Sequence, residues 1–119
     1  MRSTFFGTAL KALAVSAVIV TSHTAAALNH EDIAGKWCSD FGSYTFSRER
    51  LLVLFNDGTP RRNYRIHEYE YEDDTIRVNW DKDGEKVHTM FGNFSANGRR
   101  MAQIANRNDK VPRREFRRC

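Results

Sequence analysis

The sequence predicts an all-β protein, an antiparallel up-and-down barrel of about eight strands. From Trp37 onward, short segments that alternate apolar and polar residues are separated by turn residues, which is typical of half-buried strands. No helical period or internal repeat interrupts this pattern. The first and last segments carry the two cysteines that follow residue 27, Cys38 and Cys119, as neighbouring strands of a closed barrel would. A two-sheet β-sandwich satisfies the same pattern, so it stays open as the alternative.

Residues 1–27 have the features of a secretory signal peptide. Arg2 and Lys11 give a positive start, residues 12–20 form an apolar run, and the alanines at 25–27 are small enough for cleavage. The apolar run is shorter than the about 20 residues that a spanning helix needs. We therefore expect export to the periplasm or beyond, no membrane anchor, and a single domain over residues 28–119.

The first three strands are expected on either side of polar turns. Gly35–Asp40 contains the first large apolar residue of the domain, and Tyr44–Ser47 alternates apolar with polar residues. Leu51–Phe55 is continuously apolar, so we expect it to be buried on both faces or covered by a cap. Asn56-Asp57-Gly58 then predicts a turn, because Asp and Gly tolerate a positive φ.

The fourth strand, Arg62–Glu72, is the long one. Tyr64 and the pair Tyr69 and Tyr71 stand at opposite parity along it. Because side chains alternate between the two faces of a strand, one face cannot hold all three unless a residue is inserted. We infer a β-bulge near His67-Glu68, which would also curve the sheet.

The second half of the chain continues as hairpins. Strands are expected at Thr75–Trp80, Val87–Phe94, Met101–Ile104 and Arg113–Cys119. Asp83-Gly84 and Asn97-Gly98 are the turn signals of tight hairpins, whereas residues 106–112 are polar and predict a loop.

The two cysteines predict a disulfide between the first and last strands. If Trp37 and Phe116 both point inward, Cys38 and Cys119 both point outward, where a cross-strand bridge can form. An exported domain meets an oxidising compartment, and such a bridge stabilises by about 4 to 5 kcal/mol in the chain-entropy model. Pairing between two molecules, or two free thiols, are the alternatives.

Gly35-Lys36-Trp37 resembles the opening of the lipocalin-like (calycin) barrels. That family carries a Gly-x-Trp on its first strand, and a late arginine packs across the indole. The resemblance implies an eight-stranded barrel in which Arg114 or Arg118, which share the parity of Phe116, closes the structure against Trp37. It also implies binding of a small apolar ligand.

No pattern predicts catalysis, a metal site or a cofactor. His67 and His88 lack the convergent partners of a zinc site, and no nucleophile elbow or phosphate loop is present. Glu68, Glu70 and Glu72 alternate along one strand, which indicates a solvated outer face. We therefore expect a protein that is not an enzyme.

The abundant aromatic residues are the candidates for ligand binding. Tyr69, Tyr71 and Trp80 lie on central strands and can stack on a ligand, although filling the core of a small barrel is the favoured interpretation. Export and a domain net charge of only +2 disfavour nucleic acid.

The function that we expect is an exported, monomeric binding protein for a small apolar ligand. The alternative is an interaction module of the cell envelope, such as an inhibitor of a cell-wall hydrolase. A structural or stress protein of the envelope fits the same sequence features.

Overall fold

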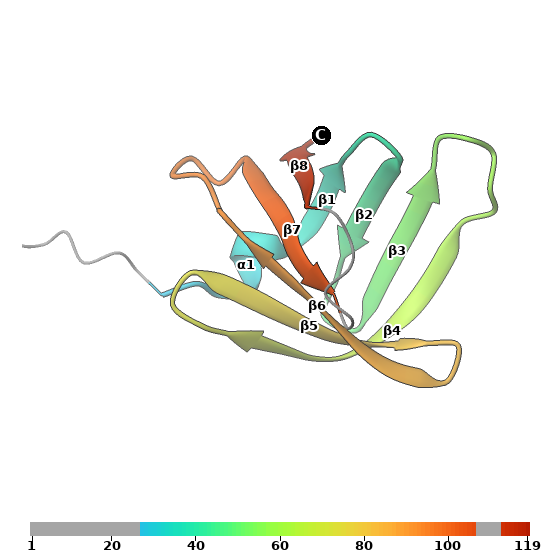
Figure 1. The fold of residues 1–119 in the computed structure, drawn as a ribbon, viewed down its shortest axis with the longest axis horizontal. Coiled ribbons are helices and arrows are strands. Elements are labelled where there is room, and N and C mark those ends of the chain that lie inside the picture. Colours follow the sequence, from blue (N-terminus) through green and yellow to red (C-terminus); the bar gives the residue numbers. More distant parts are fainter. Residues whose placement is uncertain (1–26, 107–112) are drawn as a thin grey trace, which may run out of the picture.

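The protein folds into a closed antiparallel barrel of eight strands, seen in a computed structural model that describes residues 27–106 and 113–119. Among these residues, one short helix precedes the barrel (Figure 1). The elements are α1 (His30–Ile33), β1 (Gly35–Cys38), β2 (Gly42–Phe46), β3 (Arg50–Phe55), β4 (Arg62–Tyr71), β5 (Thr75–Lys82), β6 (Glu85–Gly92), β7 (Arg100–Asn106) and β8 (Arg114–Arg118). The predicted signal peptide lies outside the described residues apart from Ala27, and so does the predicted loop at 106–112 apart from Asn106, which is the last residue of β7.

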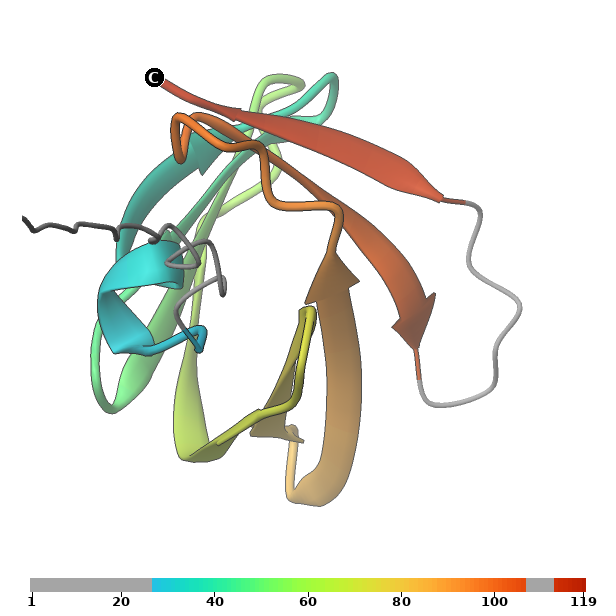
Figure 2. The ribbon, with the colours of Figure 1, turned by 90° about the vertical axis from the view of Figure 1, so that its left-hand side faces the viewer.

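Each strand pairs with the next one in the chain, and β8 returns to pair with β1. Trp37 lies opposite Arg118 and Cys38 opposite Arg117 in that closing pair. Figure 2 shows the strands arranged around a common axis, with α1 at one end. Closure leaves none of the described strands as an unpaired sheet edge, so no edge is available for pairing with another chain. The barrel prediction is confirmed, and the sandwich alternative is wrong.

A disulfide joins Cys38 to Cys119 across this closing pair. The two residues are 81 positions apart in the sequence, and their Cα atoms are 5.7 Å apart, a usual distance for a bridge. Trp37 and Phe116 are buried in the core, so the predicted parity of the two strands is correct. The first and last strands are therefore linked covalently as well as by hydrogen bonds.

The bulge predicted in β4 is present. The register between β4 and β5 shifts between Ile66 and Glu68. Tyr64 and Tyr69, on either side of the shift, both pack against the core. A second shift, between Met90 and Phe91 on β6, accommodates an extra residue on β7 that no sequence pattern indicated.

Three local expectations needed correction. Leu51 and Val53 are buried, whereas Leu52 and Leu54 are half-buried on the outer face, because a single-layered barrel meets water outside. The helix α1 was not expected, since four residues are too few to show a helical period. Asn97-Gly98 lies within a longer connection between Gly92 and Arg100 rather than in a two-residue hairpin. Asp83-Gly84, in contrast, does form the tight hairpin, and both residues have positive φ.

Candidate ligand cavity

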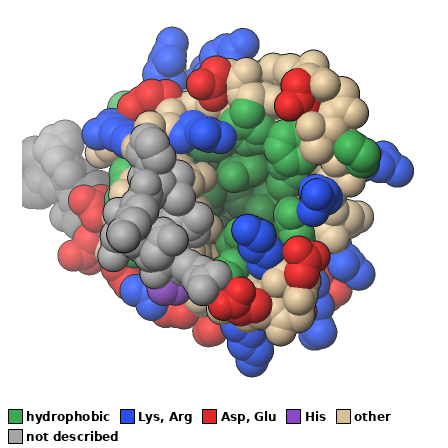
Figure 3. Space-filling model, turned by 45° about the vertical axis from the view of Figure 1, so that its right-hand side comes forward, with side chains coloured by type: hydrophobic (Ala, Val, Ile, Leu, Met, Phe, Trp, Pro, Cys, Tyr) green, Lys and Arg blue, Asp and Glu red, His purple; other side chains and the backbone are tan. Residues whose placement is uncertain are grey.

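The interior of the barrel contains a cavity of about 450 Å³. That volume lies within the range of small-molecule sites, roughly 300 to 1,000 Å³. Figure 3 looks into a hollow whose bottom is hydrophobic and whose rim carries charged side chains. The lining comes from every strand except β1 and from the β1–β2 connection: Phe41, Tyr44, Phe46, Leu51, Val53, Phe55, Tyr64, Val78, Trp80, Lys82, Val87, Thr89, Phe91, Gln103 and Arg114.

The walls of the cavity are largely aromatic, and the rings hold one another in place. Tyr64 lies against Trp80 with ring centroids 4.7 Å apart, and Phe46 meets Phe91 edge to face at 5.3 Å. Tyr44 stacks on the buried Phe116 at 5.0 Å. These packed rings make a preformed surface, because each is oriented by a neighbour rather than by a ligand. The aromatic residues therefore build the core and line the cavity at the same time.

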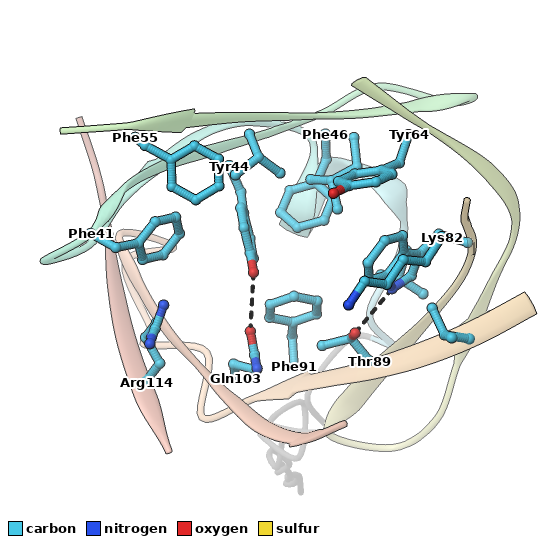
Figure 4. Close-up of a pocket in the computed structure, with 15 residues that line it drawn as sticks. Phe41, Tyr44, Phe46, Phe55, Tyr64, Lys82, Thr89, Phe91, Gln103 and Arg114 are labelled. Carbon is cyan, nitrogen blue, oxygen red and sulfur yellow. Dashed lines mark hydrogen bonds between the residues drawn. The ribbon is translucent and has the colours of Figure 1, made fainter. Parts of the chain in front are cut away.

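Two hydrogen bonds place polar groups within this apolar wall. The Tyr44 hydroxyl donates to Oε1 of Gln103 at 3.5 Å, and the indole Nε1 of Trp80 donates to Oγ1 of Thr89 at 3.0 Å (Figure 4). Gln103 and Thr89 are each only 5% exposed. Burial raises the pKa of the Tyr44 phenol, an effect that nearby Arg114 partly opposes, so the phenol stays neutral and able to donate.

The charged lining residues are both cationic. Lys82, the last residue of β5, and Arg114, the first of β8, lie on opposite sides of the cavity (Figure 4). The guanidinium carbon of Arg114 lies 4.7 Å from the centroid of the Phe41 ring. Within the described part of the chain, no Asp or Glu is among the lining residues. The cavity therefore combines an apolar interior with positive charge.

Of the three candidate ligand contacts, Trp80 lines the cavity, whereas Tyr69 and Tyr71 do not. The Tyr69 ring packs edge to face on His30 of α1, with centroids 4.9 Å apart, and its hydroxyl donates to the Ser47 carbonyl at 2.5 Å. Tyr71 stacks on Tyr69 at 6.3 Å and is 39% exposed. Tyr69 and Tyr71 thus lie together, and Tyr69 joins β4 to the α1 end of the barrel.

The cavity residues that sequence reasoning missed share a simple signal. They occupy the inward parity of strands whose positions were predicted, as Tyr44 and Phe46 do on β2 and as Val87, Thr89 and Phe91 do on β6. Strand parity alone does not tell a filled interior from a hollow one. Core filling was the favoured interpretation of the aromatics, and the structure shows that they leave part of the interior open.

The arginine that packs on Trp37 is Arg118, not Arg114. Its guanidinium carbon lies 3.9 Å from the centroid of the indole ring. The same guanidinium donates to the carbonyl of Ala34 and, at 3.2 Å, to that of Asp32. The indole Nε1 of Trp37 donates to the Ile33 carbonyl at 2.8 Å. Arg118 and Trp37 therefore fix α1 to the closing strands.

Comparisons with protein-family models, with curated proteins and with solved structures gave no match for this chain. Within residues 27–106 and 113–119, no three His, Cys, Asp or Glu side chains gather as a metal site would require. The part of the chain that the structure describes has no helix long and apolar enough to cross a membrane.

Proposed function

We propose that this protein is an exported, non-enzymatic binding protein of the lipocalin-like type, which holds a small apolar molecule in its barrel. The observation that carries the proposal is the 450 Å³ cavity, walled by aromatic and aliphatic side chains that are already packed. Preformed, mostly apolar cavities of this size bury most of a small ligand. The Cys38–Cys119 disulfide is compatible with an oxidising compartment and hence with export.

The test is binding of phenylnaphthylamine, a neutral fluorophore that brightens in apolar surroundings. Val53→Trp would fill the cavity from β3, whereas Leu52→Trp adds the same ring one residue away on the outer face. We expect the wild type and L52W to bind alike and V53W to bind at least about tenfold more weakly. Equal binding by V53W and L52W would place the probe outside the barrel and refute the proposal.

A folding control accompanies this test, because a large side chain in a core can destabilise it. Near-ultraviolet circular dichroism reports whether the aromatic walls of V53W remain packed. If V53W unfolds, Val87→Trp fills the cavity from β6, with Lys86→Trp as its outward-facing counterpart. Native mass spectrometry of the protein from its own envelope would further reveal any ligand retained during purification.

A second candidate function is an interaction module of the cell envelope, such as an inhibitor of a cell-wall hydrolase. One observation favours it: Arg100 on β7 lies directly opposite Arg117 on β8, and both are exposed. Like charges directly opposite one another destabilise a sheet, and an acidic protein surface would offset the repulsion. Crosslinking in envelope extracts should then capture a partner that the double variant Arg100→Gln/Arg117→Gln no longer captures. Equal capture by this variant would argue against the candidate.

A further inference from the structure

The two cations of the cavity are inward-facing residues of their strands. On β5 the inward positions are occupied in turn by Ile76, Val78, Trp80 and finally Lys82, and the first three of these pack in the core or against it. On β8 Arg114 has the parity of the buried Phe116. Because side chains alternate between the two faces of a strand, Lys82 and Arg114 both face the cavity rather than the outer surface.

These charges have no anionic partner among the described residues that line the cavity. The ion pair recorded on β8 joins Arg113 to Glu115, which point the other way, and Arg114 takes no part in it. Arg114 is half-buried against the Phe41 ring, so its guanidinium is only partly hydrated. Positive charge beside a low-dielectric cavity attracts anions more strongly than the same charge in open water.

The geometry of Arg114 suits an acidic head group. A planar guanidinium presents parallel N–H donors that match a carboxylate or a phosphate, and its face can remain on an aromatic ring meanwhile. The amide nitrogen of Gln103, whose Oε1 accepts from the Tyr44 hydroxyl, provides a further donor on the cavity wall. We expect Lys82 to contribute less to anion binding, because it lies directly opposite Glu85 in the β5–β6 hairpin, whose negative charge offsets part of its own.

We propose that the molecule held in this cavity is an amphipathic organic anion, whose apolar body occupies the aromatic interior and whose acidic group is bound by Arg114, while Lys82 adds positive charge from the opposite side of the cavity (Figure 4). The inference rests on the proposed function and specifies the ligand class of that same site. Inside the barrel the ligand would meet the rings of Phe46 and Phe91, and its head group would lie near Phe41.

The experiment compares ligands that differ only in the head group. Decanoate and decanol share an alkyl chain, and naphthoate and naphthol share a ring system; each displaces bound phenylnaphthylamine in a titration at about pH 8, where carboxylates are ionised. We expect each carboxylate to bind about tenfold tighter than its alcohol. Raising the ionic strength should narrow this ratio, because salt screens the attraction.

Matched charge variants assign the effect to residues. Arg114→Gln should remove most of the preference for the carboxylate and leave alcohol binding unchanged, and Lys82→Gln should remove a smaller part. Two control variants neutralise outward-facing cations instead: Arg117→Gln on β8 and Lys86→Gln on β6. Both should leave the preference for the carboxylate intact.

The outcomes separate the two proposals. If phenylnaphthylamine binds and alcohols compete as well as carboxylates, the ligand class is refuted while the binding function stands. The same holds if R114Q weakens alcohol and carboxylate equally, because Arg114 would then act only through packing. If none of the probes binds the wild-type protein, the binding function itself fails.

Discussion

Gly35 is the residue that allows the first and last strands to meet as they do. It has a φ of 101°, a conformation that side chains rarely adopt, and an added Cβ would lie 2.9 Å from Nη1 of Arg118. That guanidinium lies over Trp37, two residues further along. The Gly-x-Trp sequence therefore has a physical purpose in this chain: glycine provides room for the cation, and tryptophan provides the ring.

Gly35→Ala should lower the free energy of unfolding by about 2 to 3 kcal/mol, through backbone strain and displacement of Arg118 together. Gly58→Ala is the matched control, since Gly58 has a φ of 87° but nothing within 4 Å of its added Cβ. Urea unfolding of both variants separates the two effects. Equal losses would show that the contact with Arg118 contributes nothing beyond the strain of a positive φ.

Tyr69 should make stability depend on pH in the alkaline range. Burial raises its pKa well above the ordinary value, with the neighbouring Tyr71 adding to the effect. Above about pH 10 the unfolded chain loses this proton while the folded chain keeps it. The folded state then binds more protons, so the free energy of unfolding falls as pH rises toward the folded-state pKa.

Tyr69→Phe should therefore flatten this alkaline decline, although it also removes the hydrogen bond to Ser47 and lowers stability at neutral pH. Tyr71→Phe, at a more exposed residue, should change the slope less. Urea titrations at several pH values between about 8 and 11 measure both slopes. An unchanged slope in Y69F would mean that other groups cause the decline.

At the scale of elements, α1 is a single turn that depends on its caps. Asn29 accepts a hydrogen bond from the backbone of Glu31, and Asp32 accepts one from the backbone of Asn29. At the other end, Arg118 and the Trp37 indole bind its carbonyl groups. So short a helix would not persist alone, and these contacts account for its presence at the end of the barrel.

Asn29→Ala should lower stability by about 1 kcal/mol, because it leaves backbone donors at the helix start without a partner. Asn29→Asp keeps the acceptor and should stay within about 0.5 kcal/mol of the wild type. Thermal and urea unfolding provide the comparison. If N29A is as stable as N29D, the carbonyl contacts of Arg118 and Trp37 alone hold α1.

An element could be predicted when the pattern that specifies it lies within a short stretch of sequence, and not when it depends on distant residues. Strands β4 and β5 were predicted because alternation is local, and the β4 bulge followed from the conflicting parity of Tyr64 and Tyr69. The helix α1 carries no period, and its contacts come from Arg118, at the other end of the chain. The second bulge, beside Phe91, likewise depends on strand pairing that a single segment does not reveal.

The cavity was the least predictable feature, because it depends on volumes summed over seven strands and one connection. Trp80 was identified as a candidate ligand contact and does line it. Tyr69 and Tyr71 were chosen for the same reason, as aromatic residues on central strands, but they lie beyond the bulge and toward α1. Arg114 and Arg118 were the two candidates for closure against Trp37, and Arg118 takes that role, whereas Arg114 has the predicted inward parity but packs on Phe41. Strand parity predicts whether a side chain faces the interior or the solvent. Its position along the barrel axis can be predicted only when the register between the strands is known.

At the scale of the whole molecule, closure depends on the shortest pairing in the barrel. Only two residue pairs, Trp37–Arg118 and Cys38–Arg117, connect β1 to β8, whereas eight connect β5 to β6. The disulfide lies beside this short β1–β8 pairing and joins residues 81 positions apart. A covalent link at this position opposes separation of β1 from β8, the two strands that share the fewest paired residues.

Cys38→Ser and Cys119→Ser should each lower the free energy of unfolding by about 4 to 5 kcal/mol, the loop-closure value for a ring of this length. The double variant should be no less stable than either single one, because one bond is lost in all three. Reduced wild-type protein serves as the control and should unfold with them in urea. A loss of this size removes a large part of the stability of a small domain, about 5 to 15 kcal/mol. If the double variant were much less stable than both single variants, each cysteine would stabilise the barrel independently of the bond between them.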